Sequence, residues 1–119
     1  MARSVLVVDD DACFRDLAAR VLSGWGHEMV GEAATVADAL DRAAELRPDV
    51  ALVDIGLPDG DGFALTQRLR AMPWAITVVL ISSDADRANA PAALRAGACG
   101  FVPKRDLPGL ALRGLIEGQ

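Results

Sequence analysis

The sequence is short of cysteine, of long apolar runs and of basic charge, and each shortage excludes a class of protein. Its two cysteines, Cys13 and Cys99, are far apart and match no CxxC or zinc-ligand spacing, so a disulfide framework or a zinc motif is excluded. We expect two reduced, partly buried thiols. The longest stretch without a charge covers residues 71–83, whereas a membrane-spanning helix needs about 18 apolar residues.

A basic excess is also missing. With 17 acidic and 12 basic residues the net charge is −5, which argues against direct contact with nucleic acid or an anionic membrane. Only the apolar run 5–8 precedes the first acidic residue, and a secretory signal needs about 7–15 apolar residues. We therefore expect no signal peptide, a cytoplasmic location and one domain over residues 1–119, large enough to fold around its own core.

The charged residues are unevenly chosen. Of the 17 acidic residues 13 are Asp, and Lys104 is the only lysine beside 11 arginines. Asp is a residue of helix caps, turns and sites more than of helix interiors. The question is therefore where the aspartates lie.

Apolar patterns predict alternating strands and helices. Short, largely β-branched runs predict strands at 5–8, 28–33, 50–53, 76–81 and 99–102. Helical spacing and caps predict helices from Asp11 or Ala12 to Gly24 or Gly26, from Thr35 to Leu46, through Leu65, Leu69 and Met72 up to Pro73, from Asn89 or Ala90 to Gly97, and over 107–116 with Leu110, Ala111 and Leu115 inside. Residues 56–62 read as a loop. The order predicts an α/β fold, a doubly wound (βα)5 sandwich whose five-stranded parallel sheet has helices on both faces.

Polar residues follow most of the predicted strands. The first strand ends in Asp9-Asp10-Asp11, the third in Asp54, the fourth in Ser82-Ser83-Asp84, and Pro103-Lys104 follow the fifth. Carboxyl ends of parallel strands meet at one edge of a sheet, where ligands bind. We therefore expect the first two aspartates and Asp54 to converge there.

Such a cluster calls for a cation. Like charges about 4 Å apart repel by roughly 4 kcal/mol at an effective dielectric of 20, and one lysine cannot neutralise three carboxylates. Carboxylate, carbonyl and water oxygens suit Mg²⁺. A carboxylate beside Mg²⁺, a hydroxyl and an ammonium form a phosphoryl site, in which the carboxylate attacks phosphorus and becomes an aspartyl phosphate.

The remaining polar residues have ordinary interpretations. Taken alone, Asp11 is typical of a helix N-cap. Asp59 and Asp61 lack the downstream Glu of a calcium loop and are interpreted as turn formers. His27 has no partner spacing, and we expect it on the solvated surface.

Three segments resemble one family along nearly the whole chain. They are 5–11 (VLVVDDD), 53–62 (VDIGLPDGDG) and 97–104 (GACGFVPK), with Ser82 between the last two. Together they are similar to the receiver (CheY-like) domain of bacterial response regulators. The resemblance implies a signalling switch in a two-component phosphorelay, with only Mg²⁺-dependent self-phosphorylation and slow autodephosphorylation as chemistry of its own.

The resemblance also implies roles at the metal site. Asp54 would be the phosphoacceptor. Asp10 and Asp54 would bind Mg²⁺ through their carboxylates, Asp9 would hold a metal-bound water, and the backbone carbonyl of Gly56 would complete the protein ligands.

Three further roles follow from the same resemblance. Lys104 would contact the phosphoryl group as the family's lysine. Ser82 would be the switch hydroxyl, and Phe101 the switch aromatic that turns inward when the hydroxyl moves. An aromatic in a short strand is also typical of plain core packing, which is the alternative for Phe101.

Partners are implied as well. The phosphodonor would be a histidine on a kinase or phosphotransfer protein. In 119 residues we expect no output domain, so the output would act through a downstream protein, or the chain would be a receiver excised from a longer protein. A homodimer would use the helix from about residue 89, the strand 99–102 and the helix 107–116.

The chain departs from the family in places. The family has Pro after its lysine, whereas here Pro103 precedes Lys104 and Arg105 follows it. Gly56 and Asp84 occupy positions that tune phosphoryl lifetime in the family. A phosphohydrolase of the haloacid-dehalogenase type would need a second Asp at position 56, so the alternative that stands is a phosphorylation-independent pseudo-receiver scaffold.

Overall fold

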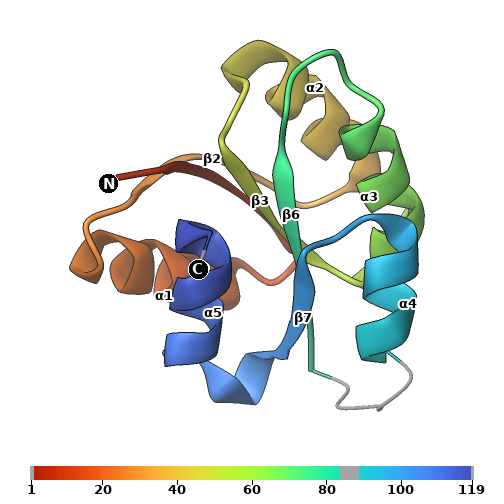
Figure 1. Cartoon of the computed structure of the whole chain (residues 1–119). Helices are drawn as coiled ribbons and strands as arrows, with labels where there is room; N and C mark the ends of the chain where they lie inside the picture. The colour runs from red at the N-terminus through yellow and green to blue at the C-terminus, as the bar shows by residue number, and fades with distance from the viewer. Residues whose placement is uncertain (1, 84–88, 119) are drawn as a thin grey trace.

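The computed structural model describes residues 2–83 and 89–118, in which strands and helices alternate (Figure 1). The strands of the main sheet are β1 (Ser4–Val8), β2 (Glu28–Ala33), β3 (Val50–Asp54), β6 (Thr77–Ser82) and β7 (Gly100–Pro103). The helices are α1 (Ala12–Gly24), α2 (Val36–Leu46), α3 (Gly62–Arg70), α4 (Asn89–Ala96) and α5 (Leu110–Glu117). A short hairpin, β4 (Gly56–Leu57) with β5 (Gly60–Asp61), and a 3-10 turn, η1 (Lys104–Asp106), complete the elements.

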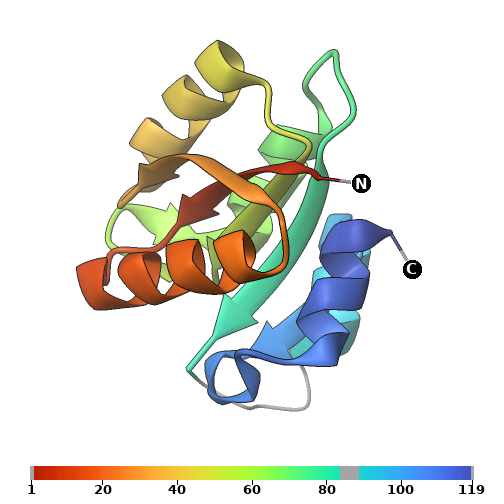
Figure 2. The same ribbon diagram turned by 90° about the vertical axis from the view of Figure 1, so that its left-hand side faces the viewer.

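The main sheet is parallel, with strand order β2-β1-β3-β6-β7. Helices α1 and α5 cover one face, and α2, α3 and α4 cover the other (Figures 1 and 2). This is the predicted doubly wound (βα)5 sandwich with the flavodoxin-like strand order, so the fold class is confirmed. Within the described ranges no helix is both long enough and apolar enough to cross a membrane.

The two faces of the sheet carry separate cores because side chains alternate along each strand. In β1, Leu6 and Val8 belong to the core under α2, α3 and α4, while Val5 and Val7 belong to the core under α1 and α5. All four side chains are completely buried. The uninterrupted apolar run is therefore what a strand covered on both faces requires.

Aspartate and threonine begin three of the helices as N-caps. The carboxylate of Asp11 accepts hydrogen bonds from the N–H groups of Cys13 and Phe14 at the start of α1, as predicted. Thr35 accepts from Asp38 N–H at 3.0 Å and begins α2. Asp61 accepts from Ala64 N–H at 2.8 Å and begins α3. Two of the aspartates, Asp11 and Asp61, are therefore used as helix caps.

Two segments differ from the prediction. Residues 56–62 are not simply a loop, because Gly56 pairs with Asp61 and Leu57 with Gly60 in the β4–β5 hairpin. Helix α3 ends at Arg70, before the predicted end near Met72.

The last helix was predicted to begin too early, and its inner face was predicted only in part, because Leu115 packs against the core while Leu110 and Ala111 are exposed. It begins at Leu110, after the 3-10 turn and Pro108, and it buries Leu112 and Ile116. Leu110 is 83% exposed. Residues 107–109, which periodicity alone assigned to the helix, instead form a non-helical connection between the 3-10 turn and α5.

His27 and the cysteines were also placed wrongly. His27 is 5% exposed, because the start of β2 lies beneath the end of α5. Its Nδ1 accepts a hydrogen bond from Arg3 N–H at 3.0 Å, and its Nε2 lies 2.8 Å from Glu117 Oε2. Cys13 and Cys99 are exposed rather than partly buried.

Candidate functional site

The site lies where the chain leaves β1 and β3. These strands are neighbours, with Val8 opposite Val53, so the residues after them meet at one edge of the sheet. The connection after β1 leads to β2 on one side, while β3 lies on the other side. Such a reversal of direction leaves a crevice at the carboxyl ends of the strands.

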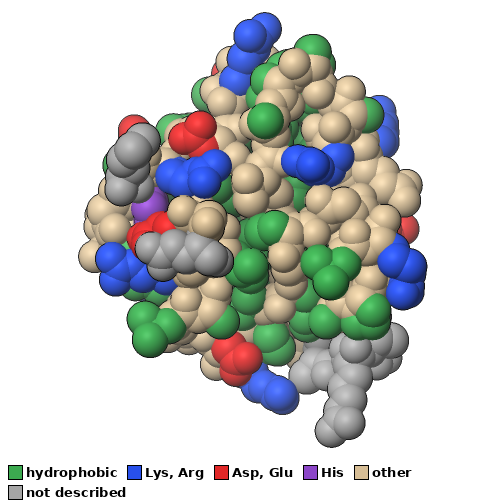
Figure 3. All heavy atoms as spheres, viewed as in Figure 1, with side chains coloured by type: hydrophobic (Ala, Val, Ile, Leu, Met, Phe, Trp, Pro, Cys, Tyr) green, Lys and Arg blue, Asp and Glu red, His purple; other side chains and the backbone are tan. Residues whose placement is uncertain are grey.

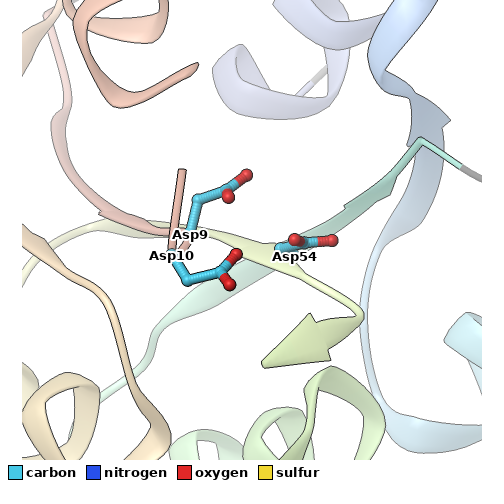
Figure 4. Close-up of side chains that lie close together, drawn as sticks. All are labelled: Asp9, Asp10 and Asp54. Atoms are coloured by element: carbon cyan, nitrogen blue, oxygen red, sulfur yellow. The ribbon is translucent and has the colours of Figure 1, made fainter. Parts of the chain in front are cut away.

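Three aspartates converge in this crevice. Carboxylate oxygens of Asp9, Asp10 and Asp54 lie within 4.8 Å of one another, and Figure 4 shows the three side chains gathered at the ends of their strands. Asp9 is completely buried, Asp54 is 7% exposed, and Asp10 is exposed. The predicted convergence is confirmed. At 4.8 Å and an effective dielectric of 20, each pair of charges repels by about 3.5 kcal/mol.

Lys104 directly follows β7, the edge strand of the sheet, and its side chain reaches the same crevice. Its Nζ lies 2.7 Å from Asp9 Oδ2 and 3.4 Å from Asp54 Oδ2. It also lies 4.6 Å from the centre of the Phe14 ring, a cation–π contact. Because one ammonium faces three carboxylates, two negative charges are left for another cation.

The pKa values follow from this arrangement. Burial raises the pKa of Asp54, the charge of Asp9 raises it further, and Lys104 only partly opposes them. For Lys104, burial works toward a lower pKa, but its bonds and charge contacts with Asp9 and Asp54 together raise the pKa. The lysine is therefore held protonated, while the ionised form of Asp54 is disfavoured by its surroundings.

Asp9 is held by its own segment and by Arg15. Its Oδ1 accepts from Asp11 N–H at 2.9 Å, and its carbonyl accepts from Arg15 Nη1 at 2.6 Å. Arg15 Nε also donates to Glu32 at 2.7 Å. Sequence reasoning missed Arg15, although its place one turn after Asp11 on α1 was a usable signal.

Two glycines shape the loop after Asp54. Gly56 N–H lies 3.4 Å from Asp54 Oδ1, and Gly56 is exposed. Gly62 N–H donates to the carbonyl of Ile55 at 2.7 Å. A Cβ at position 62 would lie 2.6 Å from the carbonyl oxygen of Asp54, so only glycine fits there.

The donor set fits a hard divalent cation. The three carboxylates stand close enough to share one ion, and among the residues that the structure describes the buried Asp9 Oδ2 has the ion pair with Lys104 but no aligned hydrogen bond. Oxygen-only ligands with open positions for water are what Mg²⁺ prefers. Asp9, Asp10 and Asp54 are thus a chemically suitable magnesium site.

The expected switch residues lie on β6 and β7, the two strands that follow β3 in the sheet order. Ser82 ends β6, is 8% exposed, and pairs with Pro103 of β7. Phe101 of β7 lies opposite Leu80 and packs half-buried against the core under α2, α3 and α4. Their roles in switching stay predictions. Asp84 lies outside the described residues.

A cavity of about 680 Å³ lies elsewhere, lined by Ala2, Arg3, Trp25, Gly26, Asp49, Arg113 and Glu117. These residues stand at the amino-terminal edge of the sheet, opposite the aspartates. A smaller cavity of about 220 Å³ lies beside Arg15 and Glu32.

Comparisons with known proteins agree with this geometry. The family model of the response regulator receiver domain matches residues 5–111. The chain is 39% identical to the DNA-binding transcriptional activator DevR/DosR of Mycobacterium tuberculosis over 98% of its own length and 54% of the relative's. It is 43% identical to protein-glutamate methylesterase/protein-glutamine glutaminase 5 of Myxococcus xanthus, over 84% of the chain and 29% of that protein. The chain thus spans about half or less of these relatives.

A solved structure shows the same fold. The BeF3-activated N-terminal receiver domain of Klebsiella pneumoniae RstA matches with a TM-score of 0.84 and 30% identity, covering 94% of each chain.

Proposed function

The chain belongs to the response regulator receiver domain family, whose members are signalling switches, and from this premise we propose that residues 1–119 form one phosphoacceptor domain. In this proposal Asp54 takes a phosphoryl group, with Mg²⁺ bound beside it, from a histidine on a kinase or phosphotransfer protein. The observation that carries the proposal is the convergence of Asp9, Asp10 and Asp54 within 4.8 Å, with Lys104 among them.

Asp54 is suited to be the nucleophile. It ends β3 at the centre of the cluster, and its raised pKa marks a carboxylate whose charge is poorly compensated. A carboxylate oxygen would attack phosphorus in line while the bond from phosphorus to the donor imidazole breaks, and the released imidazole would take a proton from solvent. The product is an aspartyl phosphate.

The neighbours of Asp54 have assigned roles. Asp9, Asp10 and the carbonyl of Gly56 would hold Mg²⁺ together with Asp54, Asp9 through a water. The bound ion supplies positive charge for the phosphoryl oxygens. Lys104 would bind a second phosphoryl oxygen, for which its Nζ is already 3.4 Å from Asp54.

The hydroxyl of Ser82 would hydrogen-bond a third phosphoryl oxygen. Phe101 would turn inward with it, since it packs only half-buried on the adjacent strand. Phosphorylation would then shift an existing equilibrium toward an active surface.

The surface that responds would be formed by α4, β7 and α5. Hydrophobic side chains gather in this region in Figure 3, and Leu94 and Leu110 are 60% and 83% exposed. This face would bind a downstream protein, an output domain in the same polypeptide, or a second copy of the chain. A cytoplasmic location accompanies the proposal.

The test is binding of beryllofluoride, which mimics the phosphoryl group on aspartate. We expect binding only with Mg²⁺, loss of binding in Asp54→Ala, and a shift in elution volume if the bound form dimerises. Failure of the unmodified chain to bind beryllofluoride with Mg²⁺ would instead favour the pseudo-receiver scaffold, which needs no phosphorylation.

A further inference from the structure

The N-terminus of α2 is capped by a residue that belongs to another element. Asp59, in the turn between β4 and β5, accepts hydrogen bonds from Val36 N–H at 2.7 Å and Ala37 N–H at 3.1 Å. These two amides are among those that a helix leaves without an internal partner. The helix also has its own cap, because Thr35 accepts from Asp38 N–H at 3.0 Å. The helix therefore has a local cap and a distant one.

The hairpin is packed against α2 as well as bonded to it. A Cβ at Gly60 would lie 3.1 Å from Val36 Cγ2, so the turn and the first residue of the helix are in close contact. Leu57 is 9% exposed and belongs to the core that includes Ala39 of α2. The bonds from Val36 and Ala37 lower the pKa of Asp59, which keeps its carboxylate ionised as an acceptor.

The same hairpin ends at the acidic crevice. Gly56 pairs with Asp61 across the β4–β5 ladder, and Gly56 N–H lies 3.4 Å from Asp54 Oδ1. Only two residues, Leu57 and Pro58, separate Asp59 from Gly56. A bond made at the tip of the hairpin therefore limits how far the backbone of Gly56 can move.

We propose that Asp59 is a positioning residue, which docks the hairpin 56–61 on the N-terminus of α2 and so holds the Gly56 carbonyl in place for Mg²⁺. This inference rests on the proposed function. The coupling between the two places must be reciprocal. If docking of the hairpin on α2 strengthens Mg²⁺ binding, then Mg²⁺ binding must equally stabilise the first turn of α2.

The chain offers a matched control for the test. Asp59→Ala and Thr35→Ala each remove a cap from the same helix end, but only Asp59→Ala releases the hairpin. Mg²⁺ affinity is measured by calorimetric titration, and amide hydrogen exchange is measured at residues 36–37 and 56–61 with and without Mg²⁺. Exchange without metal reports docking independently of any metal site.

We expect Asp59→Ala to weaken Mg²⁺ binding about tenfold, as loss of outer support for a metal site commonly does. The hairpin amides should exchange faster in this variant, and Mg²⁺ should no longer slow exchange at Val36 and Ala37. Thr35→Ala should leave Mg²⁺ affinity and hairpin exchange unchanged. Asp59→Asn, which keeps one acceptor oxygen, should fall between wild type and Asp59→Ala.

Unchanged Mg²⁺ affinity in Asp59→Ala overturns the inference and leaves the proposed function intact. An equal loss in Thr35→Ala also overturns it, because helix stability and not docking would then be responsible. If the unmodified chain binds no Mg²⁺, the proposed function fails and the metal-positioning role fails with it, whatever the hairpin exchange shows.

Discussion

Replacing Lys104 by Met tests the electrostatics of the crevice most directly, because Met keeps most of the apolar side chain and removes the ammonium group. The Nζ lies 2.7 Å from buried Asp9 and 3.4 Å from Asp54. At an effective dielectric of 20 these attractions amount to about 6 and about 5 kcal/mol. The cost of burying the lysine and its 18% exposure reduce the net value.

We expect Lys104→Met to lower the free energy of unfolding by about 3 kcal/mol without metal, since removing one partner of a buried ion pair costs about 3–5 kcal/mol. For a chain of this size that is a fall of roughly 12 °C in Tm. Urea titration in a chelator measures it. Arg105→Met is the control, because Arg105 is 74% exposed and lies 3.9 Å from Asp106, and we expect nearly unchanged stability there.

The loss of stability in Lys104→Met should depend on Mg²⁺ and on pH. Mg²⁺ at about 100 times its Kd adds about 2.7 kcal/mol to a chain that binds it, and it should bind Lys104→Met more tightly than the unmodified chain because a competing cation is gone. The loss should therefore shrink in Mg²⁺.

The pKa of Lys104 is raised from 10.5, so its stabilisation is complete below that pH and is lost only as pH rises through the folded pKa.

The loss in Lys104→Met should accordingly be constant near neutral pH and shrink in acid, where Asp54 with its raised pKa takes up a proton. A loss below about 1 kcal/mol without metal, or an equal loss in Arg105→Met, would refute the electrostatic account.

Three further changes test other parts of the structure. Asp54→Asn should raise the metal-free stability near neutral pH by about 1 kcal/mol. Because the folded pKa of Asp54 is raised from 3.8, wild-type stability falls as pH rises through that range, and urea titrations at several pH values should show no such fall in the variant. Gly62→Ala should lower the free energy of unfolding by about 1–3 kcal/mol, because its Cβ would lie 2.6 Å from the Asp54 carbonyl oxygen. Gly56→Ala is the control, because a Cβ there meets no atom within 4 Å. Thermal unfolding of both variants tests this, and equal Tm values would contradict the packing argument. His27→Ala should lower the free energy of unfolding by about 2 kcal/mol, because Glu117 and Arg3 N–H lose their buried partner. A urea midpoint equal to that of the wild type would show that the buried histidine contributes nothing to stability.

The sequence by itself determined the fold class and the centre of the site. Apolar β-branched runs such as 5–8 suit only strands covered on both faces, and their alternation with amphipathic helices leaves the doubly wound sheet as the consistent solution. Because parallel strands end at one edge, the aspartates after β1 and β3 had to meet. Asp9, Asp10, Asp54 and Lys104 follow from this rule alone, since strand topology and not loop detail places them.

Contacts between distant segments were decided only by the tertiary structure. His27 carries no local signal of burial, and it is buried because α5 happens to end above it and supplies Glu117. Leu110 is exposed because residues 107–109 connect the 3-10 turn to α5 without helical structure, so that the helix begins only at Leu110 and buries Leu112 and Ile116.

The same reason explains Arg15 and Asp59. Each makes its bonds to a segment about 17 to 23 residues away in sequence, where neither helical nor strand spacing relates the partners. Local patterns specify which element a residue joins, because backbone geometry repeats within an element. Which side chain from another element reaches it depends on how whole elements pack, and only the folded chain decides that.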